Sequence, residues 1–530
     1  MGPSGRPRAR ALIVKHLCRF GRSFVRDRRA NVALTFALAA LPLTMMVAMG
    51  LDLANATRVR MAMQDATDEA AIALARQAPT IADNQIATTA KTYINSSFNK
   101  ATVTITNATI DRNNIIATVD AQAGVPTYFA QLVGMSTIPI TTHAVARGML
   151  LEIALVVDTS GSMTQSAGSG GSKIVALRSA STALLNAMFG SQTTSTRVAM
   201  SIVPFAASVN VGSTNANAAW MDTAGSSSLA YEDFSSTTKT RWALFTDLKT
   251  TSWKGCVISR PSAQNYDVND AAPTNLTPDT LYVPWFAPDE PDGDNGNLVT
   301  GSFNNNYLND EGGNCTSPNT TKTVADSVKQ ARTCKYKGVT PTSGYGPNYL
   351  CDSNAITPLT GARSTLDTAV AALQAAGNTN ILEGFMWGWR TLSPGPPFTE
   401  GKSYTAPNNR KVIILMTDGE NNLNGVSNFN HSDYTSYGYV IKGRVGTTSS
   451  NNTTLTTALD TRTALACANA KAQGMLVYTI AFGSGAANSQ TLLRNCATSA
   501  NYFYAPQNSS DLVPVFQQIA QSINSLRISE

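Results

Sequence analysis

A run of twenty residues without a charged side chain, from Val32 to Leu51, limits how the N-terminal part of this chain can fold. As an α-helix the run is about 30 Å long, which matches the hydrocarbon thickness of a bilayer. A helix that packs against the core of a soluble protein would carry a polar face. Because this run has no such face, we predict a transmembrane helix over residues 31–53.

Positive charge is concentrated immediately before the apolar run. Residues 1–30 contain nine Lys or Arg and one acidic residue, a net charge of +8, whereas the whole chain carries +6. The rest of the chain is therefore slightly acidic overall and does not support a nucleic-acid-binding face, so we expect no nucleic-acid partner. By the positive-inside rule, residues 1–30 form a basic cytoplasmic tail and the bulk of the chain lies outside.

A cleavable secretory signal is the main alternative for the apolar run. The apolar region of such a signal is about 7–15 residues long and ends near a small-x-small cleavage site. The run here is longer, and no such site follows it closely. We therefore expect a retained, single-pass anchor.

Residues 54–148 predict a small α+β region. Ala and apolar residues recur at helical spacing after the run, so the helix is expected to continue to about Ala78. The alternating stretches ATVTITNATI and NIIATVDAQA predict a β-hairpin, VPTYFAQLVG a short helix, and PITTHAVAR a final strand. A long apolar helix that leads into a small antiparallel sheet is the layout of pilin-like proteins.

The segment RDRRANVALTFALAALPLTMMVAMGLDLANATRVRMAMQDATDEAAIALA resembles the N-terminus of TadE/TadG-like Flp pilus-assembly proteins of the bacterial tight-adherence system. Processed pilins of that system have Gly before the cleaved bond, Glu five residues after it, and then an aromatic residue. Ala30, Thr35 and Phe36 stand at these positions here. Since the Glu is missing, resemblance to the TadG-type members implies that the anchor is retained. It also implies a bacterial inner-membrane protein, mainly periplasmic or surface-exposed, with other pilus-assembly components as partners.

The stretch MLLEIALVVDTSGSM begins as an apolar run and ends in Asp158, Ser160 and Ser162. Such a run predicts a strand buried on both faces of a parallel sheet, and ligands bind at the carboxyl ends of such strands. Two hydroxyls one residue apart, above a buried carboxylate, suit a hard divalent cation such as Mg²⁺. Gly161 is expected to let the backbone turn between these ligands.

This DxSxS pattern resembles the metal-ion-dependent adhesion site of von Willebrand factor A (vWA) domains, and two further segments match the motifs of that family in order. GNTNILEGFMWGWRTL places Thr379 as the third hydroxyl ligand, and KVIILMTDGE places Asp418 as the second carboxylate. The resemblance implies that Ser160 and Ser162 bind the cation directly and that Asp158 and Asp418 act mainly through water. Thr379 would bind either directly or through water. The resemblance also implies Mg²⁺, with Mn²⁺ or Ca²⁺ as alternatives, and an acidic group of a protein partner in the remaining position.

Residues 149–530 predict one doubly wound α/β domain with a mostly parallel sheet, as in vWA and Rossmann-like folds. Helices are predicted over residues 174–189, 365–376, 456–473 and 511–526, with another from Ile381, and residues 197–212 predict a pair of strands. Two insertions, at about 212–359 and 421–453, interrupt the domain. Both begin or end near the metal-site motifs, so we expect them to crowd the binding face.

Six of the seven cysteines follow the membrane segment, and an even number there predicts disulfides in an oxidising compartment. Cys467 and Cys496 lie on the two predicted helices that flank one strand, so we pair them with each other. The other four lie in the first insertion and are expected to form two disulfides, whose pairing the sequence leaves open. These four are Cys256, Cys315, Cys334 and Cys351.

Two other features of the sequence argue against a calcium loop and against catalysis. The acidic stretch from Asp289 to Asp294 lacks the glycine and glutamate positions of a calcium loop and predicts an exposed turn. Only three histidines occur, and no G-x-S-x-G motif accompanies them, so we predict that the protein is not an enzyme.

Together these patterns predict a membrane-anchored envelope protein for tight-adherence pilus assembly or adhesion, with metal-bridged recognition of a protein partner. One alternative is a structural anchor or scaffold in which the metal only stabilises the domain. The other is a metal-dependent hydrolase.

Overall fold

The structure, a computed structural model, describes residues 28–78, 81–112, 116–168, 171–292, 303–315, 324–342, 344–483 and 489–526. The chain divides into two compact units, residues 1–148 and residues 149–529. Each unit has its own apolar core.

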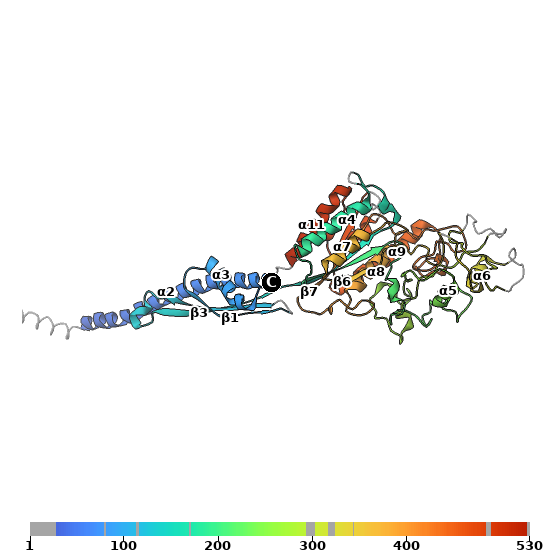
Figure 1. The fold of residues 1–530 in the computed structure, drawn as a ribbon. Coiled ribbons are helices and arrows are strands. Elements are labelled where there is room, and N and C mark those ends of the chain that lie inside the picture. The colour runs from blue at the N-terminus through green and yellow to red at the C-terminus, as the bar shows by residue number, and fades with distance from the viewer. Residues whose placement is uncertain are drawn as a thin grey trace, which may run out of the picture. The chain divides into compact units, whose positions relative to one another are not determined.

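A single long helix dominates the N-terminal unit. Helix α2, Arg28–Gln77, contains the whole apolar run and continues beyond it, as predicted (Figure 1). By length and composition, its part from Thr35 onward is the one helix among the described residues that could cross a membrane. The side chains of the run are mostly exposed, whereas from Ala56 onward one face of the helix is buried.

A three-stranded antiparallel sheet packs against the second half of α2. It has the order β1-β2-β3, with β1 at Val103–Asp111, β2 at Ile116–Pro126 and β3 at Thr137–Arg147. Alternate residues of β2 and β3 are buried, which is the period expected of a sheet covered on one face. The predicted hairpin and final strand are confirmed, and the predicted short helix is a 3₁₀ turn at Ala130–Val133.

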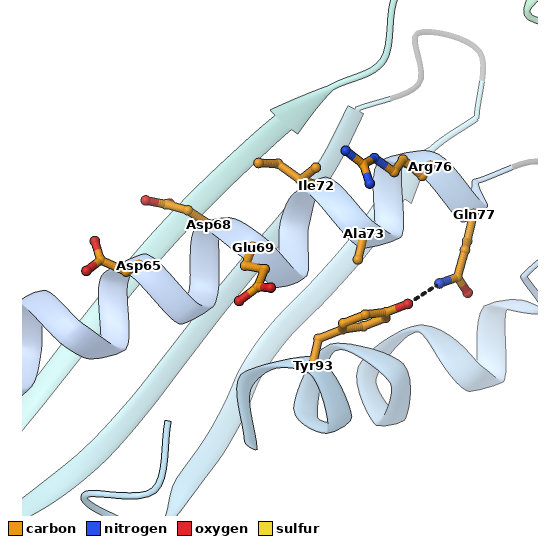
Figure 2. A pocket seen from close by; sticks show the side chains of 8 residues that line it. All are labelled: Asp65, Asp68, Glu69, Ile72, Ala73, Arg76, Gln77 and Tyr93. Carbon is orange, nitrogen blue, oxygen red and sulfur yellow. Dashed lines mark hydrogen bonds between the residues drawn. The ribbon is translucent and has the colours of Figure 1, made fainter. Parts of the chain in front are cut away.

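Helix α3, Ile86–Ser97, has no counterpart among the predicted elements. Its apolar residues Ile86, Ala90 and Ile94 lie four apart in sequence and are buried. This spacing is typical of an amphipathic helix, so the sequence did carry a signal for α3. A groove of about 560 Å³ lies between α2 and α3 and is bordered by acidic side chains of α2 (Figure 2). At one end of the groove, Gln77 donates a hydrogen bond to the Tyr93 hydroxyl. The acidic residues are exposed, so this groove is an open, solvated surface.

The C-terminal unit is a mixed α/β fold around a six-stranded sheet of order β6-β5-β4-β7-β8-β9. All neighbours are parallel except β5 and β6. The strands are β4 Leu150–Asp158, β5 Val198–Phe205, β6 Thr357–Thr360, β7 Asn409–Thr417, β8 Leu476–Ala481 and β9 Phe503–Tyr504. The predicted doubly wound, mostly parallel sheet is therefore confirmed.

Helices cover both faces of this sheet because its central strands are apolar on both sides (Figure 1). One face packs against α4 Lys173–Phe189, α7 Arg363–Ala372 and α11 Ser509–Leu526. The other packs against α8 Ile381–Leu392, α9 Asn452–Ala472 and α10 Gln490–Cys496. Gly388 of α8 lies so close to Val156 of β4 that a β-carbon there would overlap the valine methyl.

The predicted strand pair over residues 197–212 is wrong. One strand, β5, is formed, and the segment after Phe205 leaves the sheet. Asn210 then makes isolated bridges to Cys256 and Ala355 instead of a second sheet strand. The apolar residues Val209 and Val211 are buried against the first insertion. Their alternation therefore reflects burial outside the sheet, although it is also the pattern of a strand.

The first insertion is a packed substructure with little regular secondary structure, which includes the short helices α5 Arg241–Asp247 and α6 Asp326–Ala331. Its aromatic side chains extend the core of the α8 face, with Tyr282 4.9 Å from Trp387 between ring centroids. Disulfides join Cys256 to Cys351 and Cys315 to Cys334, which settles the open pairing. The predicted disulfide between Cys467 and Cys496 is also present.

The expectation of an exposed acidic turn after residue 288 is wrong for its described part. Asp289, Glu290 and Asp292 are all buried. The Asp289 carboxylate accepts hydrogen bonds from two backbone N–H groups and pairs at 2.7 Å with the buried Lys335 ammonium. Lys335 also pairs with Asp310 at 2.9 Å, so the cluster is an internal ion-pair network.

Candidate metal centre

The two predicted carboxylates meet at the carboxyl edge of the sheet. Strand β4 ends at Asp158, and its parallel neighbour β7 ends one residue before Asp418. Both side chains are buried, as expected where apolar strands end beneath their connecting loops. Parallel register thus brings together two acidic residues that are far apart in sequence.

Two serines, through one backbone N–H and two hydroxyls, join these carboxylates into one hydrogen-bonded chain. The backbone N–H of Ser160 donates to Asp158 Oδ1 at 2.8 Å, and the hydroxyl oxygens of Ser160 and Ser162 lie 3.0 Å apart. The Ser162 hydroxyl then donates to Asp418 Oδ1 at 2.7 Å. The four residues therefore present carboxylate and hydroxyl oxygens to a shared space.

Thr417, which the sequence did not single out, completes the contacts of Asp158. Its hydroxyl donates to Asp158 Oδ2 at 2.6 Å. Both oxygens of the Asp158 carboxylate are thus held by neighbours, which fixes its orientation beneath the serines.

The segment that carries Thr379 lies against the serine loop through its backbone. The N–H of Gly161 donates to Gly377 O at 2.9 Å, and the N–H of Ala376 donates to Thr159 O at 2.8 Å. Thr379 itself is buried, and among the described residues its hydroxyl has no hydrogen-bond partner. The structure therefore brings this segment to the site, while the Thr379 side chain makes no hydrogen bond with the other four predicted residues.

Gly161 lies where the backbone turns between the ligands, as expected. It has no positive φ angle and begins a 3₁₀ turn, Gly161–Thr164. A β-carbon at Gly161 would lie 3.4 Å from Gly377 O, which is an ordinary contact, so the space at this position does not require glycine. Gly377, with φ of 80°, is the residue that requires the left-handed conformation.

Lys173 is a member of the site that sequence reasoning missed. Its ammonium lies 2.7 Å from Asp418 Oδ2, and the two side chains are 8% and 0% exposed. Lys173 is the first residue of α4, a position where the helix dipole disfavours a cation. That unfavourable placement was the available signal that this lysine has a specific acidic partner.

The charge balance and the donor atoms of the site fit a divalent cation. Burial, followed by the nearby charge of Asp418, raises the pKa of Asp158 to about 7. Lys173 compensates one of two buried carboxylates, and a bound cation would compensate the other. The described residues contain no group of three or more His, Cys, Asp or Glu suited to a metal, so any ion here depends on hydroxyl oxygens, which Mg²⁺ accepts.

A protein-family model matches the N-terminal segment of the chain. Residues 30–77 match the model of a family described as putative Flp pilus-assembly TadE/G-like. This match, together with the apolar helix, supports a pilus-related, membrane-anchored protein of the cell envelope. No curated protein matches the chain.

Several solved structures of pilus proteins are similar to the chain. The vWF domain of the type V pili tip protein Mfa5 from Porphyromonas gingivalis is 12% identical, with 72% of this chain and 97% of that chain covered and a TM-score of 0.32. The pilus adhesin SpaC from Lactobacillus rhamnosus GG is 11% identical, with coverages of 81% and 34% and a TM-score of 0.32. The PilB minor pilin from Streptococcus sanguinis is 11% identical, with coverages of 81% and 79% and a TM-score of 0.31.

Proposed function

We propose that the C-terminal unit is a vWA-type binding domain that recognises a protein partner through a divalent cation. The cation would be held by Asp158, Ser160, Ser162, Thr379 and Asp418. Mg²⁺ is the first choice because all the donors are oxygens, and Mn²⁺ or Ca²⁺ are the alternatives. An acidic group of the partner would complete the coordination shell.

One observation carries this proposal: the hydrogen-bonded chain from Asp158 through Ser160 and Ser162 to Asp418 at the ends of adjacent parallel strands. Hydroxyls that only stabilised a loop would form hydrogen bonds with the backbone of that loop, as the Thr164 hydroxyl does by donating to Gly161 O at 2.7 Å. The Ser160 and Ser162 hydroxyls instead contact each other and a carboxylate. That arrangement favours a shared ligand above them.

We further propose that the protein acts in assembly of, or adhesion by, Flp-type pili, as a single-pass protein of a bacterial inner membrane with its N-terminus in the cytoplasm. The match at residues 30–77 and the basic residues before the apolar run support this placement. The three disulfides are consistent with an oxidising compartment such as the periplasm for residues 149–529. The partner would then be an envelope or pilus component.

A capture experiment tests the proposal. Full-length, detergent-solubilised protein serves as bait for envelope extract in Mg²⁺ and then in chelator, beside a Ser160→Ala, Ser162→Ala double variant. Thr164→Ala is the matched control, because Thr164 lies in the same loop outside the proposed ligand set. We expect a partner that is held only with metal and only by wild type and the control. Capture of the same partner by all three proteins in chelator would contradict metal-bridged recognition.

A structural scaffold, in which the metal only stabilises the domain, is the second candidate. It predicts that chelator lowers the unfolding temperature of the unit without releasing any partner. A metal-dependent hydrolase is the third candidate, and it would need a general base near the cation. Lys173, the titratable side chain that contacts Asp418, is committed to an ion pair, which favours a binding role over catalysis.

A further inference from the structure

The loop between β2 and β3 exposes an unusual concentration of large apolar side chains. Within residues 128–135, five such side chains are 43–75% exposed, with Leu132 the most exposed at 75%. They are Tyr128, Phe129, Leu132, Val133 and Met135. No residue from Thr127 to Ser136 is charged. A surface of this kind marks a place where the protein meets an apolar partner.

The loop is tied to the end of the apolar run of α2. Asp52 follows the last residue of that run, and its carboxylate accepts hydrogen bonds from three consecutive backbone N–H groups of the loop. The distances are 2.9 Å from Tyr128, 2.8 Å from Phe129 and 2.7 Å from Ala130. Because Asp52 is itself buried by these contacts, the loop is held at the level where the apolar run ends.

Backbone contacts within the loop keep its shape. The N–H of Thr127 donates to Ser136 O at 3.1 Å, and the N–H of Met135 donates to Ala130 O at 3.1 Å. Gly134, with φ of 88°, reverses the chain where a side chain would be strained. The apolar side chains are therefore displayed by an ordered turn.

The rest of the sheet leads away from this level along α2 (Figure 1). Farther along the helix, the Arg60 side chain donates to Thr141 O at 3.2 Å, and the Gln64 side chain donates to His143 O at 2.8 Å. Strand β3 thus follows α2 away from the run, and the loop is the part of the sheet nearest to it. Leu51 and Leu53, on either side of Asp52, are also exposed, so helix and loop form one apolar surface.

We propose that the β2–β3 loop inserts its apolar side chains into the headgroup region of the bilayer that α2 crosses, as a second contact with the lipid. The continuity of the loop with the apolar run favours lipid over a second protein chain. Tyr and Phe at this level match the aromatic residues that gather at membrane interfaces. The proposal rests on α2 spanning the bilayer and is independent of the metal centre.

Site-directed spin labelling of the full chain in phosphatidylcholine–phosphatidylglycerol vesicles tests this proposal. Six of the seven cysteines form the disulfides, so Cys18→Ser leaves a background in which one added cysteine carries the nitroxide. The label is placed at Leu132 in the loop, at Met46 in the apolar run, or at Val145 as the control. Val145 is an exposed apolar residue of β3, about 26 Å from the start of that strand.

We expect the Met46 and Leu132 labels to be protected from a water-soluble nickel relaxation agent and accessible to oxygen, with Leu132 the shallower of the two. The Val145 label should be accessible to nickel. Nickel accessibility at Leu132 equal to that at Val145, while Met46 stays protected, would overturn the proposal without affecting the anchor. A Met46 label accessible to nickel would overturn both.

Dilution with unlabelled protein separates lipid from a second copy of the chain. Protection of Leu132 by lipid should not change when labelled protein is diluted or when the lipid-to-protein ratio is raised. Spin–spin broadening at Leu132 that disappears on dilution, together with loss of protection at high lipid-to-protein ratio, would instead show a protein–protein contact and refute lipid insertion.

Discussion

Replacement of Lys173 by Met should strongly destabilise the C-terminal unit in the absence of metal. Methionine retains most of the apolar volume of the lysine but removes the ammonium that lies 2.7 Å from Asp418. Asp418 would then remain as an uncompensated carboxylate, 0% exposed and close to the charge of Asp158. Removal of one partner from such a buried pair costs about 3–5 kcal/mol, so we expect a loss of this size in the free energy of unfolding.

Urea unfolding in chelator, followed by tryptophan fluorescence, measures this loss. All six tryptophans lie in residues 149–529, so the signal reports on the C-terminal unit. Lys254→Met is the matched control, because Lys254 pairs with Asp352 at 3.6 Å and the two side chains are 53% and 36% exposed. An exposed pair contributes about 1 kcal/mol or less. If Lys173→Met costs no more than Lys254→Met, the buried pair that we describe is absent.

Three further predictions concern the same unit. Gly388→Ala should cost about 1–3 kcal/mol of unfolding free energy through overlap with Val156, and adding Val156→Ala should recover part of that loss in a double-mutant cycle. Replacing Cys256 and Cys351 by Ser should lower the free energy of unfolding by up to about 4–5 kcal/mol, because this disulfide closes the longest loop, with a separation of 95 residues. The loss should exceed that from removing either other disulfide, and equal losses would contradict this. Burial raises the pKa of Glu290 from 4.5 to about 7, so the contribution of its protonation to stability is fully present below about pH 4.5 and is lost as the pH rises through about 7. In Glu290→Gln, urea unfolding should therefore show a smaller loss of stability between about pH 5 and about pH 8 than in wild type, and an unchanged loss would place Glu290 in water.

The parts of the fold that follow from local patterns could be predicted from sequence. The apolar run, the alternating hairpin of the N-terminal unit and the apolar strands that end at Asp158 and Thr417 each have a period or a length that suits one structure. Since parallel strands end at a common edge, the approach of Asp158 to Asp418 follows from the same patterns. Lys173 was missed because it begins a helix, α4, and so lies outside the strand-end pattern that aligns the two carboxylates.

The first insertion could not be predicted in the same way, because its stability depends on contacts between distant residues. The ion pair of Asp289 with Lys335 and the disulfide of Cys256 with Cys351 have no local period that would reveal them. The stretch after Pro288 has the composition of an exposed turn, and its burial is compensated by a buried lysine and by backbone N–H groups that other segments supply. Of the insertion disulfides, one joins cysteines 19 residues apart and the other joins cysteines 95 residues apart, so proximity in sequence does not account for both.

We propose above that the oxygens around Asp158 bind one divalent cation. Calorimetric titration of Mg²⁺ into the full-length, detergent-solubilised protein tests it most directly, with Ser160→Ala, Ser162→Ala as the double variant and Thr164→Ala as the control. We expect saturable binding of one ion by wild type and by the control, and no measurable binding by a double variant that still unfolds cooperatively. Equal binding by all three proteins, or no binding by wild type with Mg²⁺, Mn²⁺ or Ca²⁺, would contradict it.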